Sequence, residues 1–125
     1  MKNVKIRAFI PGNTQPPVIP VRPLDGSLPV LGAVRMPKGE GWGVERGGRI
    51  VAWAVLRGPD AQGYRHITVE TDVHHRGRGY ATACVQAALR AADGPVLYLC
   101  SMDNEKSART ALRAGMVEVP WPMEG

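Results

Sequence analysis

Alternation of hydrophobic and polar residues marks several short stretches of this chain, and each of them predicts a β-strand. In the first stretch, Val4, Ile6 and Ala8 would point to one face of a strand and their neighbours to the other. A continuous apolar run at residues 96–100 is typical of a strand covered on both faces. The predicted strands cover residues 2–9, 41–45, 49–56, 64–73, 96–100 and 116–119.

Two helices are predicted in the C-terminal half of the chain. Residues 79–92 place apolar side chains three and four positions apart, and residues 93–95 (Asp-Gly-Pro) end that helix. A second, shorter helix follows the polar residues 101–105 and ends near Gly115, which suits a left-handed cap position. The hydrophobic pattern therefore predicts a mixed α/β fold, an antiparallel meander followed by a β-α-β-α-β arrangement.

A proline-rich segment separates the first strand from the rest of the chain. Seven of the eleven prolines lie in residues 11–37. Proline removes a backbone donor and clashes with the preceding turn, so this segment can hold little helix. It is expected to be either a long ordered loop or a segment that covers a substrate.

Length and composition narrow the class of protein. A chain of 125 residues predicts a single domain, residues 1–125, with its core in residues 42–119. No apolar run approaches the roughly 20 residues of a membrane span, and no secretory signal is visible at the start. Cys84 and Cys100 lack the spacing of a metal or redox site, which predicts two buried thiols, no bound metal and a cytoplasmic location.

The charge balance predicts an anionic partner. The formal net charge is +5, with twelve arginines against four lysines. A nucleic acid and a phosphorylated cofactor both fit this balance. The basic residues are spread along the chain rather than gathered in a stripe, which argues against a dedicated nucleic-acid-binding protein.

The strongest local signal is the stretch Arg76-Gly77-Arg78-Gly79-Tyr80-Ala81. It lies between a predicted strand and a predicted helix. Glycines at such a junction allow a tight turn and let an anion approach exposed backbone N–H groups, and the helix start adds a partial positive charge. The junction therefore predicts a phosphate-binding site.

This order of elements, with two motifs, resembles the GNAT superfamily of acyl-CoA-dependent N-acyltransferases. The family signature is Gln/Arg-x-x-Gly-x-Gly/Ala, and a second motif often follows downstream. The matching residues are Arg76, Gly79 and Ala81 in the first motif, and Asn104, Ser107 or Ala108, and Gly115-Met116 in the second. The resemblance covers roughly residues 42–119.

The resemblance implies acetyl-CoA as cosubstrate and an amine as acceptor. Backbone amides of the junction would bind the pyrophosphate, with Arg76 or Arg78 adding charge-assisted bonds. The pantetheine arm would lie along the fourth strand, and Asn104 would contact the cofactor. The residues implied in cofactor binding are Val69, Glu70, Thr71, Arg76, Gly77, Arg78, Gly79, Tyr80, Ala81 and Asn104.

The catalytic groups follow less directly from the resemblance. Many family members place a tyrosine seven residues after the asparagine as the acid for the departing thiolate, and here that position is Ala111. Strand alternation puts His66, Thr68 and Glu70 on one face, and His66 and then Glu70 are the candidate general bases.

The acceptor side departs furthest from the family pattern. The proline-rich segment stands where relatives have two helices that shape the acceptor cleft, so the acceptor stays open, and a surface for a second subunit is allowed. The leading hypothesis is transfer of an acetyl group to a primary amine by direct attack in a ternary complex. The alternatives are a non-catalytic acyl-CoA-binding module and, from a different class, a small basic nucleic-acid-binding protein.

Overall fold

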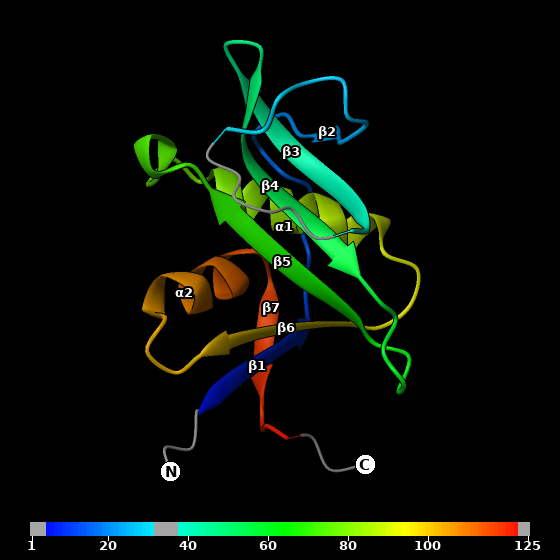
Figure 1. The fold of residues 1–125 in the computed structure, drawn as a ribbon. Helices are drawn as coiled ribbons and strands as arrows, with labels where there is room; N and C mark the ends of the chain where they lie inside the picture. Colours follow the sequence, from blue (N-terminus) through cyan, green and yellow to red (C-terminus); the bar gives the residue numbers. More distant parts are fainter. Residues whose placement is uncertain (1–4, 32–37, 123–125) are drawn as a thin grey trace.

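The computed structural model describes residues 5–31 and 38–122. Within them, one sheet and two α-helices form the fold, with the strands ordered β2-β3-β4-β5-β6-β1-β7 across the sheet (Figure 1). The elements are β1 (Ile6–Pro11), β2 (Arg22–Pro23), β3 (Glu40–Arg46), β4 (Arg49–Arg57), β5 (Arg65–Thr71), the 3-10 turn η1 (Val73–His75), α1 (Tyr80–Ala91), β6 (Val96–Ser101), α2 (Glu105–Arg113) and β7 (Met116–Val119).

The centre of the sheet contains a break in strand pairing. Strand β5 pairs with β4 antiparallel from Ala52↔Thr71 to Arg57↔His66. Its other edge pairs with β6 in parallel at only two positions, Arg65↔Val96 and His66↔Leu97. Past this point the two strands diverge, and α2 lies where they separate (Figure 1). The break leaves one edge of β5 without a strand partner within the described residues.

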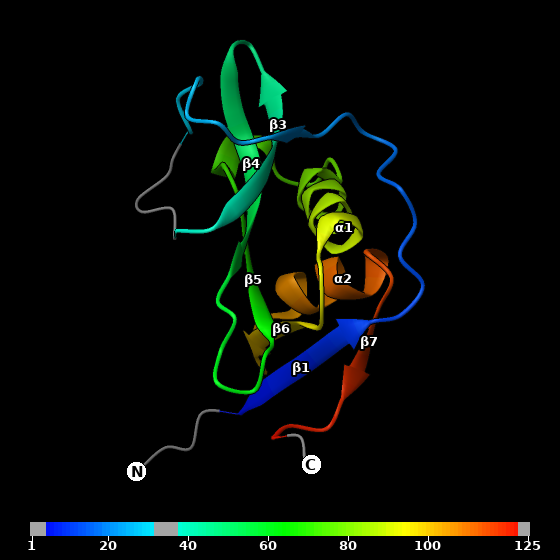
Figure 2. The same ribbon diagram turned by 90° about the vertical axis from the view of Figure 1, so that its right-hand side faces the viewer.

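Both helices pack on one side of the sheet, and the main core lies between (Figure 2). Strand β4 supplies the apolar run Ile50–Leu56, which is buried throughout because it is covered on both faces. A second, smaller core lies on the opposite face, where Ile50, Trp53 and Val55 are covered by Leu24, Leu28 and Val30. That opposite face is called the open face below, since neither helix covers it.

The proline-rich segment is an ordered loop over the part that is described. Residues 12–21 run along the side of the sheet that holds the helices (Figure 2). The chain then crosses over, forms β2 against β3, and is tied to the sheet by Leu31 N–H donating to the Ile50 carbonyl at 2.8 Å. No helix occurs between residues 11 and 31, as the prolines predict, whereas residues 32–37 lie outside the described part.

The predicted mixed α/β fold is confirmed, with shifts at element boundaries. The first strand begins at Ile6, and the residues before Lys5 lie outside the described part. The helix predicted at 79–92 covers Tyr80–Ala91. The sequence pattern missed η1 and the short strand β2, which are too brief to produce a period. Among the described helices, none is long and apolar enough to cross a membrane.

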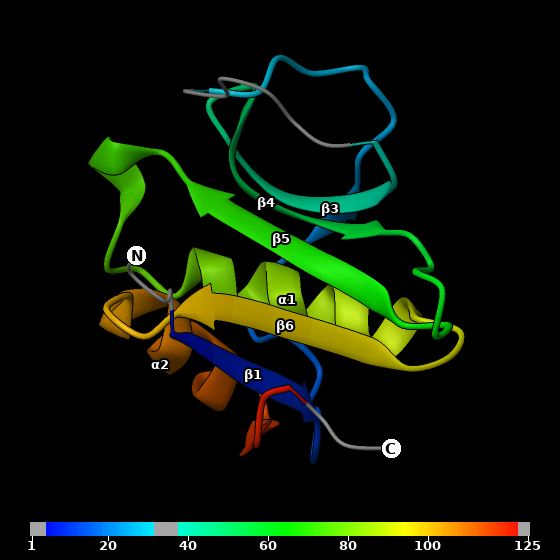
Figure 3. The same ribbon diagram turned by 60° about the horizontal axis from the view of Figure 1, so that its bottom comes forward.

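The topology brings distant segments together below the break. Strand β1 inserts between β6 and β7, antiparallel to both, and Figure 3 shows it lying alongside β6. Arg7 of β1 donates to both carboxylate oxygens of Glu118 on β7, at 2.7 and 2.9 Å. The pair ties β1 to β7 at this end of the sheet.

Candidate functional site

The junction between β5 and α1 is held by the Asp72 carboxylate. Asp72 accepts hydrogen bonds from the backbone N–H of His74 at 3.1 Å and from the His75 ring Nδ1 at 2.8 Å. The bond from His75, opposed by burial and aided by the bond from His74, keeps the pKa of Asp72 below its ordinary value. These contacts fix the turn that carries the chain from the strand into the glycine stretch.

The glycine stretch leaves the start of α1 open to an anion. Gly77 and Gly79 have φ of +78° and +80°, in the left-handed region that glycine tolerates at little cost. Gly79 is the N-cap of α1 and offers no side-chain bond to the first helical N–H groups. A Cβ added at Gly77 would meet nothing within 4 Å, and at Gly79 only the Ile19 side chain at 3.6 Å. Unsatisfied N–H groups and open space together make an anion site.

A cavity of about 750 Å³ surrounds this helix start. It extends from β5 across the divergence to α2. The residues that line it are Val69, Glu70, Thr71, His75, Arg76, Gly77, Gly79, Tyr80, Ala81, Thr82, Tyr98, Asn104, Lys106, Ser107, Arg109, Thr110 and Arg113. Every residue implied in cofactor binding lies in this set except Arg78. The large cavity therefore brings together, in one place, residues that the sequence separates by up to 35 positions.

The large cavity is strongly basic. Arg76, Lys106, Arg109 and Arg113 line it, against Glu70 as the single carboxylate among its lining residues. The three basic residues of α2 are spaced three and four apart, so they share one face of the helix. This basic face was not among the sequence predictions, although the spacing alone could have identified it.

Asn104 has a structural role that needs no ligand. Its side-chain Oδ1 accepts a hydrogen bond from the Ser107 backbone N–H at 3.1 Å and caps the start of α2. The residue also lines the large cavity, where its amide group can still donate. Helix capping and the implied cofactor contact explain an asparagine at this position equally well.

A smaller pocket of about 190 Å³ meets the large cavity. Its lining residues are Arg57, His66, Ile67, Thr68, Val69, Tyr98, Leu99 and Ser107. Val69, Tyr98 and Ser107 also line the large cavity. The two spaces therefore meet where β5 and β6 diverge.

Two polar residues of the small pocket, His66 and Thr68, belong to the open face, whereas Tyr98 packs in the main core and Ser107 lies on α2. Glu70 pairs across the sheet with Trp53, which lies in the core of that face. His66 and Thr68 share the face because strand neighbours alternate, while Ile67 packs into the main core. The large cavity begins at α1 on the helix-bearing side. Ligands could thus approach the break from both sides of the sheet.

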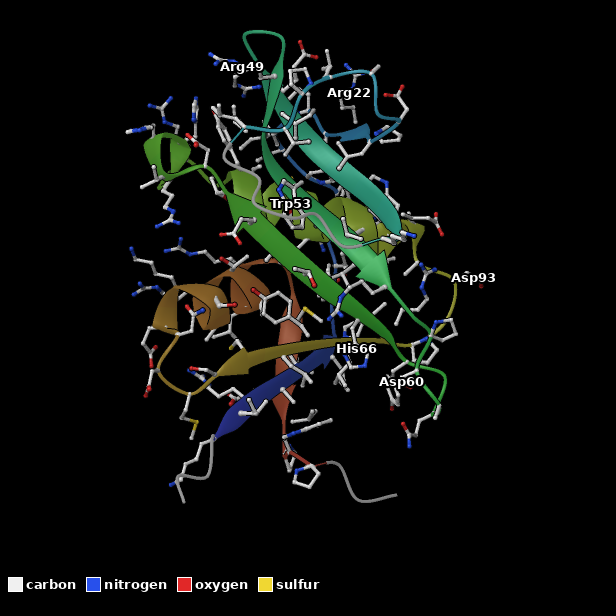
Figure 4. The ribbon with its side chains drawn as sticks, viewed as in Figure 1. Arg22, Arg49, Trp53, Asp60, His66 and Asp93 are labelled. Atoms are coloured by element: carbon white, nitrogen blue, oxygen red, sulfur yellow. The ribbon has the colours of Figure 1, made fainter. Side chains whose placement is uncertain are left out.

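His66 is oriented by a carboxylate that the sequence analysis did not single out. Its ring Nε2 lies 2.7 Å from Asp60 Oδ2, and the two side chains lie together beside the start of β5 (Figure 4). Asp60 Oδ1 accepts from the backbone N–H groups of Gln62 at 2.9 Å and Tyr64 at 3.0 Å. The bond with His66 comes first among the causes that lower the Asp60 pKa. In a neutral ring this bond places the proton on Nε2 and leaves Nδ1 as the basic nitrogen.

Glu70, the second candidate base, has a different environment. Its side chain is exposed, lines the large cavity, and makes no hydrogen bond to any described residue. Nothing in the described part of the chain fixes its direction. Of the two candidate bases, His66 is therefore the one that a described residue orients, and both lie on the face that strand alternation predicted.

A tyrosine hydroxyl reaches the break from an unexpected strand. Ala111, at the position of the family's tyrosine, is fully buried and carries no acidic group. Tyr98 of β6 donates to the Ser107 carbonyl at 2.9 Å and lies 2.8 Å from Ser107 Oγ. Burial raises the pKa of Tyr98 to about 12, so the phenol stays protonated. One sequence signal could have identified Tyr98. Its hydroxyl lies inside an apolar strand, and a buried hydroxyl needs a hydrogen-bond partner.

The two thiols belong to the core rather than the site. Cys84 lies on the buried side of α1, where burial raises its pKa to about 12, and Cys100 is buried on β6. Neither lines a cavity described above. Among the described residues, no group of three or more histidine, cysteine or acidic side chains is arranged to hold a metal ion.

Sequence comparison places this architecture in a family. The model of the acetyltransferase (GNAT) family matches residues 13–116, which is most of the chain. The chain therefore belongs to the GNAT acetyltransferase family. A search of curated proteins gave no significant match.

Solved structures with the same fold include two proteins described as GNAT-family acetyltransferases. The one from Novosphingobium aromaticivorans has a TM-score of 0.70 at 21% identity, over 91% of this chain and 59% of its own. The one from Colwellia psychrerythraea has a TM-score of 0.53 at 19% identity, over 63% of this chain and 31% of its own. At these identities the likeness concerns the fold, and the chain spans 59% of the first protein and 31% of the second.

Proposed function

We propose that this protein transfers an acetyl group from acetyl-CoA to a primary amine by direct attack in a ternary complex. The observation that carries the proposal is the meeting of two cavities at the break between β5 and β6. The large basic cavity suits a long phosphorylated thioester, and the small pocket suits an amine that arrives from the other face. A direct transfer needs both reactants in contact, which this arrangement allows.

The large cavity fits coenzyme A in its chemistry. The open N-terminus of α1 and the glycines beside it suit the pyrophosphate, and Arg76 stands next to them. The basic face of α2 suits the ribose phosphate. The edge of β5 at residues 69–71 has backbone groups without a strand partner in the described part, and a pantetheine arm carries amides that can pair with them.

His66 is the proposed general base. It lines the small pocket, and Asp60 holds it with its basic Nδ1 free. The acceptor enters as its ammonium form and gives one proton to His66, and the neutral nitrogen then attacks the thioester carbonyl carbon. The C–N bond forms, the C–S bond breaks, and the electron pair leaves with the sulfur, while the second amine proton passes to solvent.

Tyr98 is proposed to stabilise the departing sulfur. Its hydroxyl borders both spaces, and turning it from the Ser107 carbonyl would direct its proton into the break. With a pKa of about 12 the phenol donates a hydrogen bond rather than its proton. A hydrogen bond is sufficient to stabilise the departing sulfur, because a thiol with a pKa near 8.5 can depart as thiolate and take its proton from water.

One observation favours a second function, a module that binds acyl-CoA without turnover. Ala111 is buried where the family has its acid, and Tyr98 is already satisfied by Ser107. Under this reading the large cavity would keep its role and the small pocket would bind no acceptor.

A two-step measurement tests the proposal. Acetyl-CoA at 100 times its Kd should raise the unfolding free energy by about 2.7 kcal/mol, seen as a higher Tm. CoA release with a panel of primary amines then reports turnover. No thermal shift at saturating acetyl-CoA would reject both CoA-dependent functions, and a shift without turnover on any amine would favour the binding module. Salt-sensitive binding to arbitrary DNA or RNA would favour a nucleic-acid protein instead.

A further inference from the structure

The small pocket carries an arginine next to the proposed base. Arg57 is the last residue of β4, and it pairs across the sheet with His66, so both side chains leave the same face. Its Nε donates to Thr68 Oγ1 at 3.0 Å. This bond anchors the guanidinium to β5, within the lining of the pocket. Arg57 is thus an exposed cation that one side-chain hydrogen bond anchors to β5.

The guanidinium has binding capacity that the described residues do not use. Its two terminal nitrogens have no hydrogen-bond or ion-pair partner in the described part of the chain. No carboxylate lines the small pocket, and the nearby Asp60 carboxylate is engaged by His66 and two backbone N–H groups. The pocket therefore combines a basic nitrogen at His66 with an anchored cation that lacks a counter-ion.

We infer that the small pocket takes a primary amine that also carries a carboxylate, with Arg57 binding the carboxylate and His66 facing the amine. This inference rests on the proposed acetyl transfer and names the class of acceptor. The terminal nitrogens of a guanidinium match the two oxygens of a planar carboxylate in paired hydrogen bonds. A diamine would bring a second cation against Arg57, and a neutral amine would leave it unpaired.

The volume of the small pocket limits the size of the acceptor. Its volume of about 190 Å³ lies below the roughly 300–1,000 Å³ of sites for drug-sized ligands. The pocket therefore holds a small amino acid whole, or the amino-acid end of a longer molecule. Among the described residues, Leu99 and the aliphatic part of Thr68 supply the apolar contacts on its open-face side, which suits a short side chain.

Matched acceptors separate the contribution of the carboxylate from that of the amine. We would measure kcat/KM for glycine against glycinamide and for alanine against alaninamide, at saturating acetyl-CoA. The wild-type protein should prefer the carboxylates by about 30-fold, as expected for paired charge-assisted hydrogen bonds. Arg57→Gln should bring this ratio close to one, and Arg57→Lys should retain part of it.

A control variant removes the same charge elsewhere. Arg49 begins β4 at the far end of the strand, remote from His66 (Figure 4). Arg49→Gln should leave the ratio unchanged, and both glutamine variants should keep the wild-type thermal shift with acetyl-CoA. Equal or better turnover of the amides by the wild-type protein would overturn the inference and leave the proposed function standing.

A binding measurement keeps the inference testable if no amine is turned over. N-acetylglycine and N-acetylglycinamide, which carry the same acetyl group, would be titrated into CoA-saturated protein and followed by NMR. Binding that requires the carboxylate and is lost in Arg57→Gln would support the inference while the transfer itself fails. Absence of carboxylate-dependent binding as well as turnover would overturn both.

Discussion

The two cavities that meet at the break in the sheet are built in different ways. The large cavity is formed by the backbone of one strand-to-helix junction and by charges spread over one helix face. The small pocket is formed by single side chains on β4, β5, β6 and α2, with one of them oriented from the loop before β5. Backbone groups remain when a side chain is replaced. In the small pocket, by contrast, each role depends on a single side chain.

This difference predicts different responses to mutation. Binding in the large cavity should resist the loss of any one side chain, because several cations share the ligand's charge, and should fail when a new group fills the anion site. Chemistry in the small pocket should fail when one side chain is removed. The substitutions below test this contrast.

The largest effect is expected for His66→Ala. Removal of a general base should lower kcat/KM by about 100- to 1,000-fold while the Kd for acetyl-CoA stays unchanged, because His66 lines only the small pocket. Steady-state kinetics and calorimetric titration measure the two quantities. His74→Ala is the control, since His74 is an exposed histidine of η1 outside both cavities. Should Glu70→Gln produce the loss instead, Glu70 would be the base.

The next effect concerns the anion site. Gly79→Asp should weaken acetyl-CoA binding by about 50-fold, because a carboxylate would project beside the open start of α1. Gly79→Asn has nearly the same shape and the same strain at φ +80°, without the charge. It should lose far less affinity, and both Kd values come from titration of folded protein. Equal losses in the two variants would mean that shape or strain, rather than charge, matters at this position.

The anion site of the large cavity could be predicted from sequence, because its parts are local. The glycines need positive φ, the helix start follows them directly, and all of these features lie within six residues. The fold was accessible for the same reason, since periodicity reports which face of an element is buried. The basic face of α2 was equally readable from its spacing.

The small pocket could not be predicted to the same extent, because it depends on directions that periodicity does not encode. Alternation assigns His66 to one face of the strand. It does not predict that Asp60, in the loop before β5, forms a hydrogen bond with His66. The strand pairing around the break joins segments far apart in the chain, since β6 pairs with β5 at only two positions and with β1 on its other edge. Tyr98 was not predicted as a site residue, because the apolar run at 96–100 does not indicate where the tyrosine hydroxyl lies.

Tyr98→Phe should produce an intermediate effect at the point where the two spaces meet. We expect kcat to fall about 10-fold with little change in Kd, together with a loss of about 1 kcal/mol in unfolding free energy from the missing hydrogen bond. Tyr64→Phe is the control, since the Tyr64 hydroxyl makes no hydrogen bond to a described residue. A loss of stability with full kcat would make Tyr98 a structural residue only.

A smaller effect is expected for the basic face of α2. Arg109→Gln should weaken acetyl-CoA binding about threefold, because the other cations of the large cavity remain. The dependence of Kd on salt should become shallower, as one screened interaction is lost. Arg90→Gln removes a charge from α1 outside the cavity and should change neither quantity. An Arg109 effect as large as that of Gly79→Asp would contradict the idea of shared charge.

The smallest effects concern the carboxylates that hold the two regions in shape. The pKa of Asp60 is lowered mainly by His66, and that of Asp72 mainly by His75. A lowered pKa contributes stability that is present above the ordinary carboxyl value of about 3.9 and is lost as the pH falls through the lower folded value. Urea unfolding between pH 6 and pH 2.5 should therefore show a steeper acid loss in the wild-type protein than in Asp60→Asn or Asp72→Asn.

The two variants should differ, because Asp72 holds the junction at the large cavity and Asp60 holds His66 in the small pocket. The Asp72 side chain is 8% exposed and that of Asp60 is 31% exposed, so solvent screens Asp72 less. Asp72→Asn should flatten the acid limb more and should also weaken acetyl-CoA binding, because it loosens the junction. Asp60→Asn should flatten it less and change kcat rather than cofactor affinity, because its contact is with His66. A reversed pattern would show that Asp60, and not Asp72, is the carboxylate that holds the cofactor side together.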